Sequence, residues 1–232
     1  MNEKIKIFND KCGDLSIDEI LQQAFKLIEG EKSVSFSGQI EDVALIEAVT
    51  RLKLASRFYT LDTGRLHEET YKIMDKVKFR YEIDLEVFFP LATDIRKMTQ
   101  ENGLYAFKQS VQERKKCCLV RKVLPNKLAL KNTKLWINGL RREQAASRTN
   151  IDFLSFDEDL NVWKLSPLLN WTWQQVLDYA QEKKLYKNTL YDQGYPSIGC
   201  EPCTRAIVQG EDLRAGRWWW ENADQKECGL HA

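Results

Sequence analysis

The sequence predicts an α/β fold built on a parallel sheet with helices on both faces. Short strand-like runs alternate with segments of helical periodicity, and glycine-containing turns separate them. This alternation is typical of βαβ units, whose crossover helices cover both faces of the sheet. A chain of 232 residues, 43% of them hydrophobic, is long enough for one such domain with a sizeable core.

The elements are expected in a regular order. Ser16 to Glu19 has the form of a capping box, and apolar residues then recur at helical spacing. Each following strand is a short apolar run that ends at turn residues. The expected helices cover about 16–29, 42–54 and 66–78, and the expected strands cover 34–37, 56–61, 81–87, 135–138 and 162–165.

From about Tyr186 the periodicity ends, and glycines, prolines and cysteines become frequent. We therefore expect a single domain over 1–232, in which 186–232 is a loop-rich segment ending in a mobile catalytic tail. This segment is too short to bury a core alone. It is expected to fold back over the carboxyl edge of the sheet, where ligands bind in open α/β folds.

Composition excludes several classes of partner. The formal net charge is +1, so no strong field attracts nucleic acid or an acidic membrane. The N-terminus lacks the pattern of a secretory signal, and no stretch approaches a membrane span of about 20 apolar residues. The cytoplasm is the expected location. In that reducing compartment the six cysteines indicate metal ligands or catalytic thiols before disulfides.

Two loops at strand ends are candidate nucleotide contacts. Ser35, Ser37 and Gly38 precede a helix, and hydroxyl and N–H groups at a helix N-terminus suit a phosphate, although an ordinary turn would have the same pattern. The loop after the next strand would then face the adenosine, although its residues also favour a simple turn. This second loop comprises Asp62, Thr63, Gly64 and Arg65.

Four cysteines form a candidate metal site, as two pairs: Cys117 with Cys118, and Cys200 with Cys203. Adjacent cysteines point in divergent directions and suit one tetrahedral zinc ion poorly. A 4Fe–4S cube, with its irons at separate corners, accepts neighbouring residues. The alternative is that the first pair is buried in a helix and only the second pair binds metal.

Basic residues near these motifs are candidate anion contacts. Lys122 would lie one helical turn beyond Cys118 and on the same face, unless it is an ordinary surface lysine. Arg141 and Arg142 follow a strand, where guanidinium groups can hold phosphate with two parallel bonds. A structural ion-pair network is the competing interpretation for these arginines.

Cys228 lies four residues from the chain end, between charged residues and a glycine. A cysteine in an exposed tail has no packing role, and a neighbouring Lys or His could lower its pKa. We therefore interpret Cys228 as a reactive thiol. Nothing around Cys12 indicates a role for that residue.

Taken together, these segments resemble the assimilatory sulfonucleotide reductases, specifically the cluster-bearing adenylyl-sulfate reductase type. The resemblance runs from Ser35 to His231. It departs from the usual loop at Gln39 and Ile40, where one extra residue precedes Glu41, so contacts of the loop 39–42 stay open. The motifs that carry it are SFSG with EDVALIE, LDTGRLHEETY, CCLVRK, GLRREQ, GCEPCTRA, RAGRWWWE and KECGLH.

The resemblance implies a Rossmann-like fold of the adenine nucleotide alpha hydrolase type. It implies one 4Fe–4S cluster on the four paired cysteines, Cys228 as nucleophile, and Lys122, Arg214 and Arg217 around sulfate and phosphate. The implied activity is thioredoxin-dependent reduction of adenosine 5′-phosphosulfate (APS) to sulfite and AMP, through a cysteine S-sulfonate, in sulfate assimilation and cysteine biosynthesis. We expect thioredoxin or a similar dithiol as partner, and a homo-oligomer.

Three alternatives stay open. The 3′-phosphorylated nucleotide PAPS could be the substrate, alone or beside APS. A pyrophosphatase-loop ligase or thiolating enzyme would share the nucleotide loop, but Glu41 and Asp42 argue against pyrophosphate binding. A zinc-stabilised nucleic-acid module is disfavoured by the neutral charge.

Overall fold

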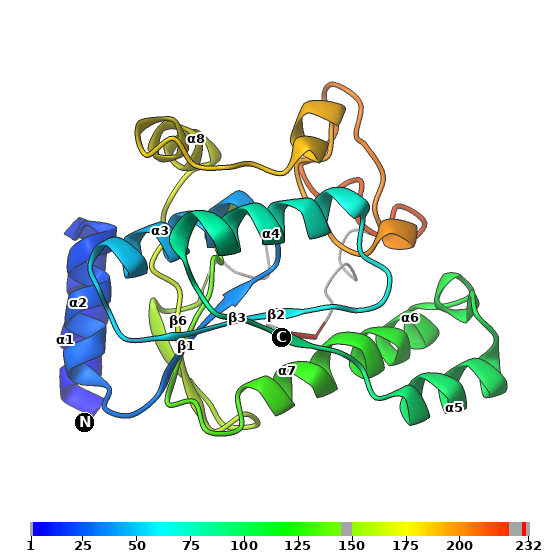
Figure 1. Cartoon of the computed structure of the whole chain (residues 1–232), viewed down its shortest axis with the longest axis horizontal. Coiled ribbons are helices and arrows are strands. Elements are labelled where there is room, and N and C mark those ends of the chain that lie inside the picture. The colour runs from blue at the N-terminus through cyan, green and yellow to red at the C-terminus, as the bar shows by residue number, and fades with distance from the viewer. Residues whose placement is uncertain (1, 145–149, 223–228, 231–232) are drawn as a thin grey trace.

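In the computed structural model, which describes residues 2–144, 150–222 and 229–230, a six-stranded sheet is covered by helices (Figure 1). The strand order is β3-β2-β1-β4-β6-β5, so β1 and β4 lie at the centre. The strands are β1 Lys32–Phe36, β2 Arg57–Leu61, β3 Leu85–Phe88, β4 Leu135–Ile137, β5 Leu154–Asp157 and β6 Val162–Leu165. All five strands expected from the sequence are confirmed.

The expectation of a wholly parallel sheet is corrected at one edge. Strands β3, β2, β1, β4 and β6 pair in parallel, whereas β5 pairs antiparallel with β6. Only the residues 158–161 join β5 to β6, and a connection this short permits an antiparallel neighbour alone. Asn161 takes a left-handed conformation (φ 52°) within this turn.

The helices confirm the expected elements and add others. Ser16 caps α2 through the predicted box: the Glu19 N–H donates to Ser16 Oγ, and the Ser16 N–H donates to Glu19 Oε2. The helices are α1 Asn2–Lys11, α2 Ile17–Leu27, α3 Ile40–Arg51, α4 Glu68–Tyr81, α5 Ala92–Asn102, α6 Val111–Cys118, α7 Leu124–Ala129 and α8 Trp173–Glu182. The helices expected from the sequence did not include α1, α5, α6, α7 or α8, although a helix around Cys117 and Lys122 was considered.

Helix α3 is the centre of the core. Every residue from Ile40 to Val49 is buried, including Glu41, Asp42 and Glu47. The helix contacts β1 on one side and α2, α4 and α8 on others. A helix enclosed on all sides cannot shift without disturbing several elements, so its N-terminus is held firmly at the end of β1.

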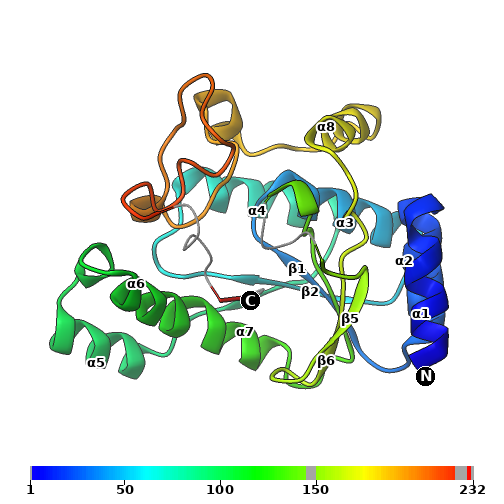
Figure 2. The ribbon, with the colours of Figure 1, turned by 180° about the vertical axis from the view of Figure 1, so that it is seen from behind.

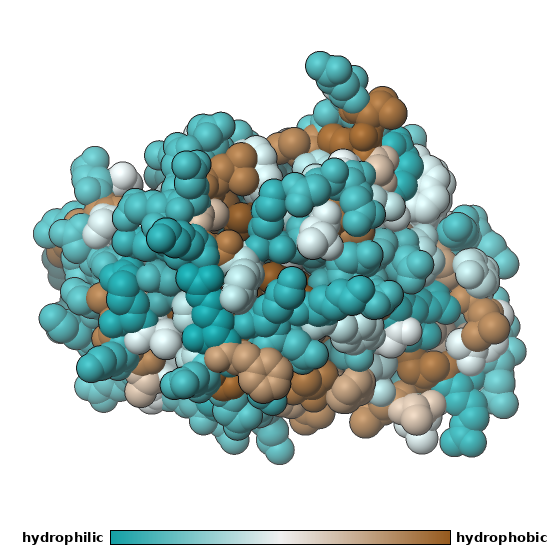
Figure 3. Space-filling model, turned by 45° about the horizontal axis from the view of Figure 1, so that its top comes forward, coloured by the Kyte–Doolittle hydropathy of each residue, from teal (hydrophilic) through white to brown (hydrophobic). Residues whose placement is uncertain are grey.

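Two parts of the chain face each other at one end of the sheet. Figure 1 shows α5, α6 and α7 below the sheet and the orange segment after α8 above it, and Figure 2 shows the same arrangement from behind. The face seen in Figure 3 is mainly hydrophilic, with hydrophobic side chains in separate patches. Among the described residues, no helix has both the length and the apolar character of a membrane span.

We predict that Ser16→Ala lowers stability by about 1 kcal/mol, because the first turn of α2 loses its side-chain cap. For a chain of this size the melting temperature should fall by about 2–4 °C in thermal unfolding. Gln22→Ala, on the exposed side of the same helix, is the control and should stay within about 0.5 kcal/mol. Equal losses in both variants would contradict the role of the cap.

Candidate active site

A pocket opens at the carboxyl ends of the central strands. Ser35, Ser37 and Thr63 line it from β1 and β2 and the loops after them, and Asn138 follows β4. The far wall comes from the C-terminal segment, including Ser197–Gly199, Arg214, Arg217 and Trp218. The segment therefore folds back over the carboxyl edge of the sheet, as expected from the sequence. Ligands bind at this place in doubly wound sheets.

The loop after β1 is held by an internal carboxylate. The Ser37 N–H and the Ser37 hydroxyl both donate to Asp42 Oδ2, at 2.7 and 2.6 Å. Ser35 Oγ instead donates to the Ile137 carbonyl and accepts from Trp136 Nε1. Of the donors that the sequence assigned to a phosphate, those of Ser37 are thus engaged by Asp42 and the Ser35 hydroxyl by the Ile137 carbonyl.

Burial raises the pKa of Asp42 to about 7 from 3.8, against the lowering effect of its hydrogen bonds to Ser37. Two glycines permit the close packing here. A Cβ on Gly139 would lie 2.5 Å from Asp42 Oδ1, and one on Gly38, which has φ +81°, would lie 2.8 Å from Thr70 Cγ2. Gly38 therefore brings the loop against α4 and does not line the pocket.

The loop after β2 divides its residues between the pocket and its own turn. Asp62 accepts from the Gly64 N–H at 2.7 Å and from the Tyr71 hydroxyl at 2.9 Å, which stabilises the turn. Of this loop, only Thr63 lines the pocket. Arg65 points elsewhere: it donates to the Leu104 carbonyl and stacks over Phe107.

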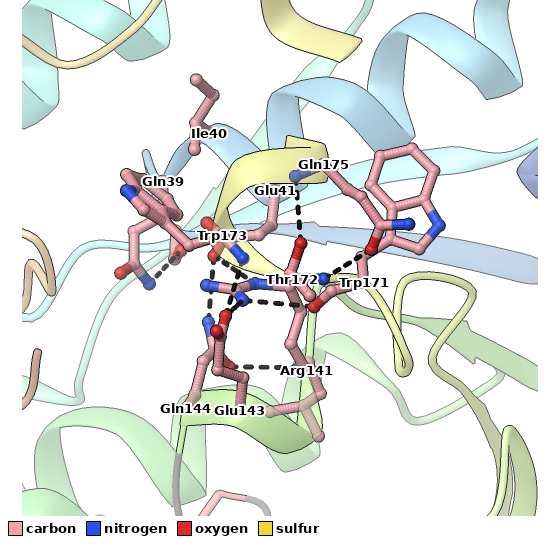
Figure 4. A network of polar contacts seen from close by, with 12 residues as sticks. Gln39, Ile40, Glu41, Arg141, Glu143, Gln144, Trp171, Thr172, Trp173 and Gln175 are labelled. Carbon is pink, nitrogen blue, oxygen red and sulfur yellow. Dashed lines mark hydrogen bonds and ion pairs between the residues drawn. The ribbon is translucent and has the colours of Figure 1, made fainter. Parts of the chain in front are cut away.

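Arg141 lies in a buried ion-pair network, which Figure 4 shows. Its Nε donates to Glu41 Oε1 at 3.0 Å and its Nη1 to Glu143 Oε2 at 2.6 Å, while Gln144 also donates to Glu41. Glu143 in turn accepts the Trp173 N–H at the start of α8. The structure therefore favours the structural interpretation of Arg141, which joins the N-termini of α3 and α8.

Arg142 also lies away from the pocket. It donates to Asn170 Oδ1 and to the Ile151 carbonyl, and its guanidinium stacks over Phe153. The structure thus separates both arginines from the nucleotide contacts suggested by their position after a strand, because their side chains are used to hold neighbouring loops.

The two cysteine pairs, 83 residues apart, meet around one small cavity beside the pocket. Cys117, Cys118, Cys200 and Cys203 all line it, and the described cysteines are free of disulfides. Five cationic side chains share the lining with these four thiols. They are Arg65, Arg114, Arg121, Lys122 and Arg217.

This cavity fits an anionic sulfur-rich group. Arg121 Nε, Arg217 Nε and Trp218 Nε1 are buried and have no hydrogen-bond partner among the described residues, and all three residues line the cavity. Thiolates or sulfides there would provide the missing acceptors. Within the described ranges, no three His, Cys, Asp or Glu side chains lie as close together as one metal ion requires. The fit thus rests on the shared cavity and its charges.

The surrounding charges affect the thiols unequally. Burial by itself would raise the pKa of Cys200, but the charge of Lys122, the hydrogen bond with Thr63 Oγ1 at 3.2 Å and the neighbouring arginines together lower it. The charges of Arg217 and Arg121 act in the same direction. Burial dominates at Cys203 and raises its pKa to about 12.

Lys122 lies in a turn whose backbone conformation the sequence did not indicate. The turn Leu119–Val123 is π-helical and not α-helical, and it follows Cys118 directly. Lys122 nevertheless lines the cysteine cavity, as expected, and it lines the pocket as well. Arg217 and Trp218 do the same, so these three residues form the wall shared by the two cavities.

Arg214 and Arg217 both line the pocket. Arg217 is buried and donates to the Ile198 carbonyl at 3.1 Å. Gly199 makes room for it, because a Cβ there would lie 2.5 Å from Arg217 Nη2. Cys228 lies outside the described residues. Leu230, two positions beyond it in the sequence, lines the pocket.

Sequence reasoning missed several residues of this site. Arg121, next to Lys122, donates to the Thr63 carbonyl at 2.6 Å, and Trp218 packs with the cysteines. Both lie inside the motifs CCLVRK and RAGRWWWE, so the motifs could have drawn attention to them. Arg114 precedes those motifs, and no local signal indicated that it is buried.

The fold and this paired site define an α/β nucleotide-binding protein of the adenine nucleotide alpha hydrolase type, with a cysteine-lined centre beside the nucleotide pocket. The family model described as phosphoadenosine phosphosulfate reductase domain matches residues 31–206, and the chain belongs to this family. The resemblance inferred from the motifs is confirmed.

Curated relatives extend the likeness over most of the chain. The adenosine 5′-phosphosulfate reductase of Burkholderia cepacia is 42% identical over 93% of this chain and 86% of its own, and that of Agrobacterium fabrum is 44% identical over 83% and 74%. Among solved structures, a phosphoadenylyl-sulfate reductase from Candida auris has a TM-score of 0.74 at 21% identity, covering 89% of this chain and 98% of its own. That structural likeness supports the fold.

We predict that the stability of the protein falls as pH rises from about 4 to about 7, through Asp42. Because its folded pKa is raised, the folded state keeps a proton that the unfolded state has lost in this window. The loss is at most about 1.4 kcal/mol per pH unit. Above pH 7 this contribution becomes constant.

Asp42→Asn should remove this pH dependence, as measured by urea unfolding at several pH values between 4 and 8. Asp75→Asn, on an exposed position of α4, is the control and should keep the parental profile. Parallel profiles for the parent and Asp42→Asn would show that Asp42 does not titrate in this range.

Proposed function

We propose that this protein reduces APS to sulfite and AMP, with Cys228 as the sulfur nucleophile. The observation that carries the proposal is the wall of Lys122, Arg217 and Trp218, which is common to a pocket at the carboxyl edge of the sheet and to a cavity lined by four cysteines. Relatives at 42% and 44% identity are APS reductases by name.

The cations of the pocket are suited to the anionic half of this substrate. Lys122, Arg214 and Arg217 lie toward the C-terminal segment, and we place the phosphosulfate there. The adenosine then lies toward the strand ends, near Thr63 and Ser35. Asp42, which holds the loop after β1, leaves Ser37 without donors for a second phosphate.

The reaction divides into two displacements at sulfur. The Cys228 thiolate attacks the sulfur of APS, the bond from that sulfur to the phosphate oxygen breaks, and AMP leaves with the electron pair. A cysteine S-sulfonate forms. A dithiol, thioredoxin or a similar protein, then attacks the Cys228 sulfur, and sulfite leaves. The second thiol of the dithiol then attacks the mixed disulfide, which regenerates Cys228. The dithiol therefore supplies both electrons.

Two features of the described residues support Cys228, in the C-terminal tail, as the nucleophile. Leu230 lines the pocket, so the residue two positions after Cys228 lies at the place where the substrate is proposed to bind. The cationic wall would stabilise negative charge as it develops on the departing AMP phosphate.

The cysteine cavity is proposed to hold one 4Fe–4S cluster on Cys117, Cys118, Cys200 and Cys203. When bound, the cluster would supply a fixed sulfur-rich charge beside the sulfate, while electrons come from the dithiol. Arg121, Arg217 and Trp218 have the unsatisfied N–H groups to receive it. We further propose that the protein acts in the cytoplasm, in sulfate assimilation and cysteine biosynthesis.

PAPS is the second candidate substrate. It is favoured by the description of the family and by the likeness to the Candida auris enzyme. The loop after β1 favours APS, because the Ser37 N–H and hydroxyl are already bound to Asp42 and would not be available to an additional phosphate group there. A homo-oligomer stays a prediction.

We predict that anaerobically purified protein with excess dithiol releases sulfite and AMP from APS faster than from PAPS, in parallel kinetics. APS that carries radioactive sulfur should label the parent and leave Cys228→Ser unlabelled and inactive. Cys12→Ala, at a buried cysteine of the core, is the control and should retain turnover. Turnover by Cys228→Ser would exclude Cys228 as the nucleophile. Inactivity of the iron-loaded parent would exclude APS reduction as the function.

We predict that the same preparation is brown and contains about four irons and about four labile sulfides per chain. Cys203→Ser should lose most of both, together with the visible absorbance, because one ligand of the cavity is removed. Cys12→Ala should keep the parental content. A colourless protein that contains zinc would contradict the cluster.

A further inference from the structure

Arg114 and Glu221 form a buried ion pair between two distant segments. Arg114 Nε donates to Glu221 Oε1 and Oε2 at 3.1 and 3.2 Å, and its Nη2 donates to Oε2 at 2.7 Å. The two side chains are 0% and 3% exposed. A buried pair of this kind is weak evidence for a stabilising role, because the cost of desolvation offsets the attraction. The role of the Arg114–Glu221 pair is therefore inferred from the two segments that it joins and not from the existence of the pair alone.

On the side of Arg114, the pair is attached to the cysteine site. Arg114 lies in α6, one helical turn before Cys117 and Cys118, and it interacts with the Cys118 thiol. It also lines the cysteine cavity. The helix that carries two of the proposed cluster ligands thus also carries the buried partner of Glu221.

On the other side, the pair holds the segment that precedes Cys228. The Glu221 N–H donates to the Trp218 carbonyl at 2.8 Å, so the two residues form one turn. Trp218 is 1% exposed, and its ring centroid lies 4.6 Å from Arg114 Cζ and 4.7 Å from Arg217 Cζ. Its φ of +39° is unusual for a bulky residue, which indicates that the surroundings determine its conformation.

We propose that the Arg114–Glu221 pair positions the catalytic tail, by fixing its base to the cluster-binding helix. The inference rests on the proposed function and names a positioning pair for it. Leu230, which lines the pocket, is nine positions after Glu221 in the sequence. Without the pair, the nearest buried anchor upstream is Trp218, whose N–H donates to the Cys203 carbonyl at 3.1 Å, and the span to be closed grows to twelve positions.

The longer loop has a calculable effect. Loop-closure entropy grows as three halves of the logarithm of loop length, so this extension disfavours closure of the span by roughly 1.5-fold. Displacement of Trp218, which stacks on Arg114, would add to this. The substrate contacts of Lys122 and Arg214 are not part of the pair. The rate of S-sulfonate formation should therefore change more than the affinity for APS, to which Trp218 and Arg217 also contribute as lining residues of the pocket.

The test compares Glu221→Ala with the double variant Arg114→Met/Glu221→Leu, which removes both charges and keeps apolar volume. In both, S-sulfonate formation in a single turnover at saturating APS should slow by at least roughly 1.5-fold. The half-saturating APS concentration should change by less than this rate, and the iron content should stay parental. Glu211→Gln, which breaks the more exposed Arg205–Glu211 pair of the same segment, is the matched control and should react at the parental rate.

Limited digestion with trypsin supplies a readout that needs no substrate. Arg217 is buried in the parent, and cleavage after it should accelerate in both variants and not in Glu211→Gln. Parental rates and parental digestion in the double variant would overturn the inference. So would a double variant that has lost iron and sulfide, because the pair would then serve assembly of the cysteine site. If the parent forms no S-sulfonate, the proposed function fails, and digestion still decides whether the pair anchors the segment.

Discussion

The site depends on the balance of charge around four buried thiols. Five cations line the same small cavity, and isolated buried charges are too costly to persist without partners. Each partner identified here lies far along the chain: Glu221 for Arg114, the Thr63 carbonyl for Arg121, and the Ile198 carbonyl for Arg217. The requirement for these partners brings the helix α6, the loop after β2 and the C-terminal segment into one place.

On the opposite side of the pocket, two carboxyl groups hold neighbouring segments in place by accepting hydrogen bonds. Asp42 accepts two hydrogen bonds from Ser37, and Glu41 accepts from Arg141 and Gln144. Both acids belong to the first turn of α3, which is enclosed by other elements, so the loop after β1 is fixed by its own chain before any ligand arrives. A pocket that is fixed in advance loses less entropy when it binds a nucleotide.

Local patterns recovered most of the regular elements, and their failures have local causes. The strand β5 was missed although Leu154–Asp157 (LSFD) alternates between apolar and polar residues, a signal that was available and unused. Helix α8 was missed although Thr172 and Gln175 form a capping box, a signal that was available and unused. The π-helical turn Leu119–Val123, which contains Lys122, has no marker in the residue pattern.

The sequence by itself determined the α/β class, the order of the strands along the chain, and the two cysteine pairs with their neighbouring basic residues, because periodicity and motif spacing are local properties. Only the tertiary structure decided which cations face the cysteines, that Asp42 engages Ser37, and that Arg141 joins two helices instead of lining the pocket. These outcomes depend on which distant side chains come within a few ångströms of each other. The distances between such side chains are set by the path of the whole chain and cannot be inferred from any single segment.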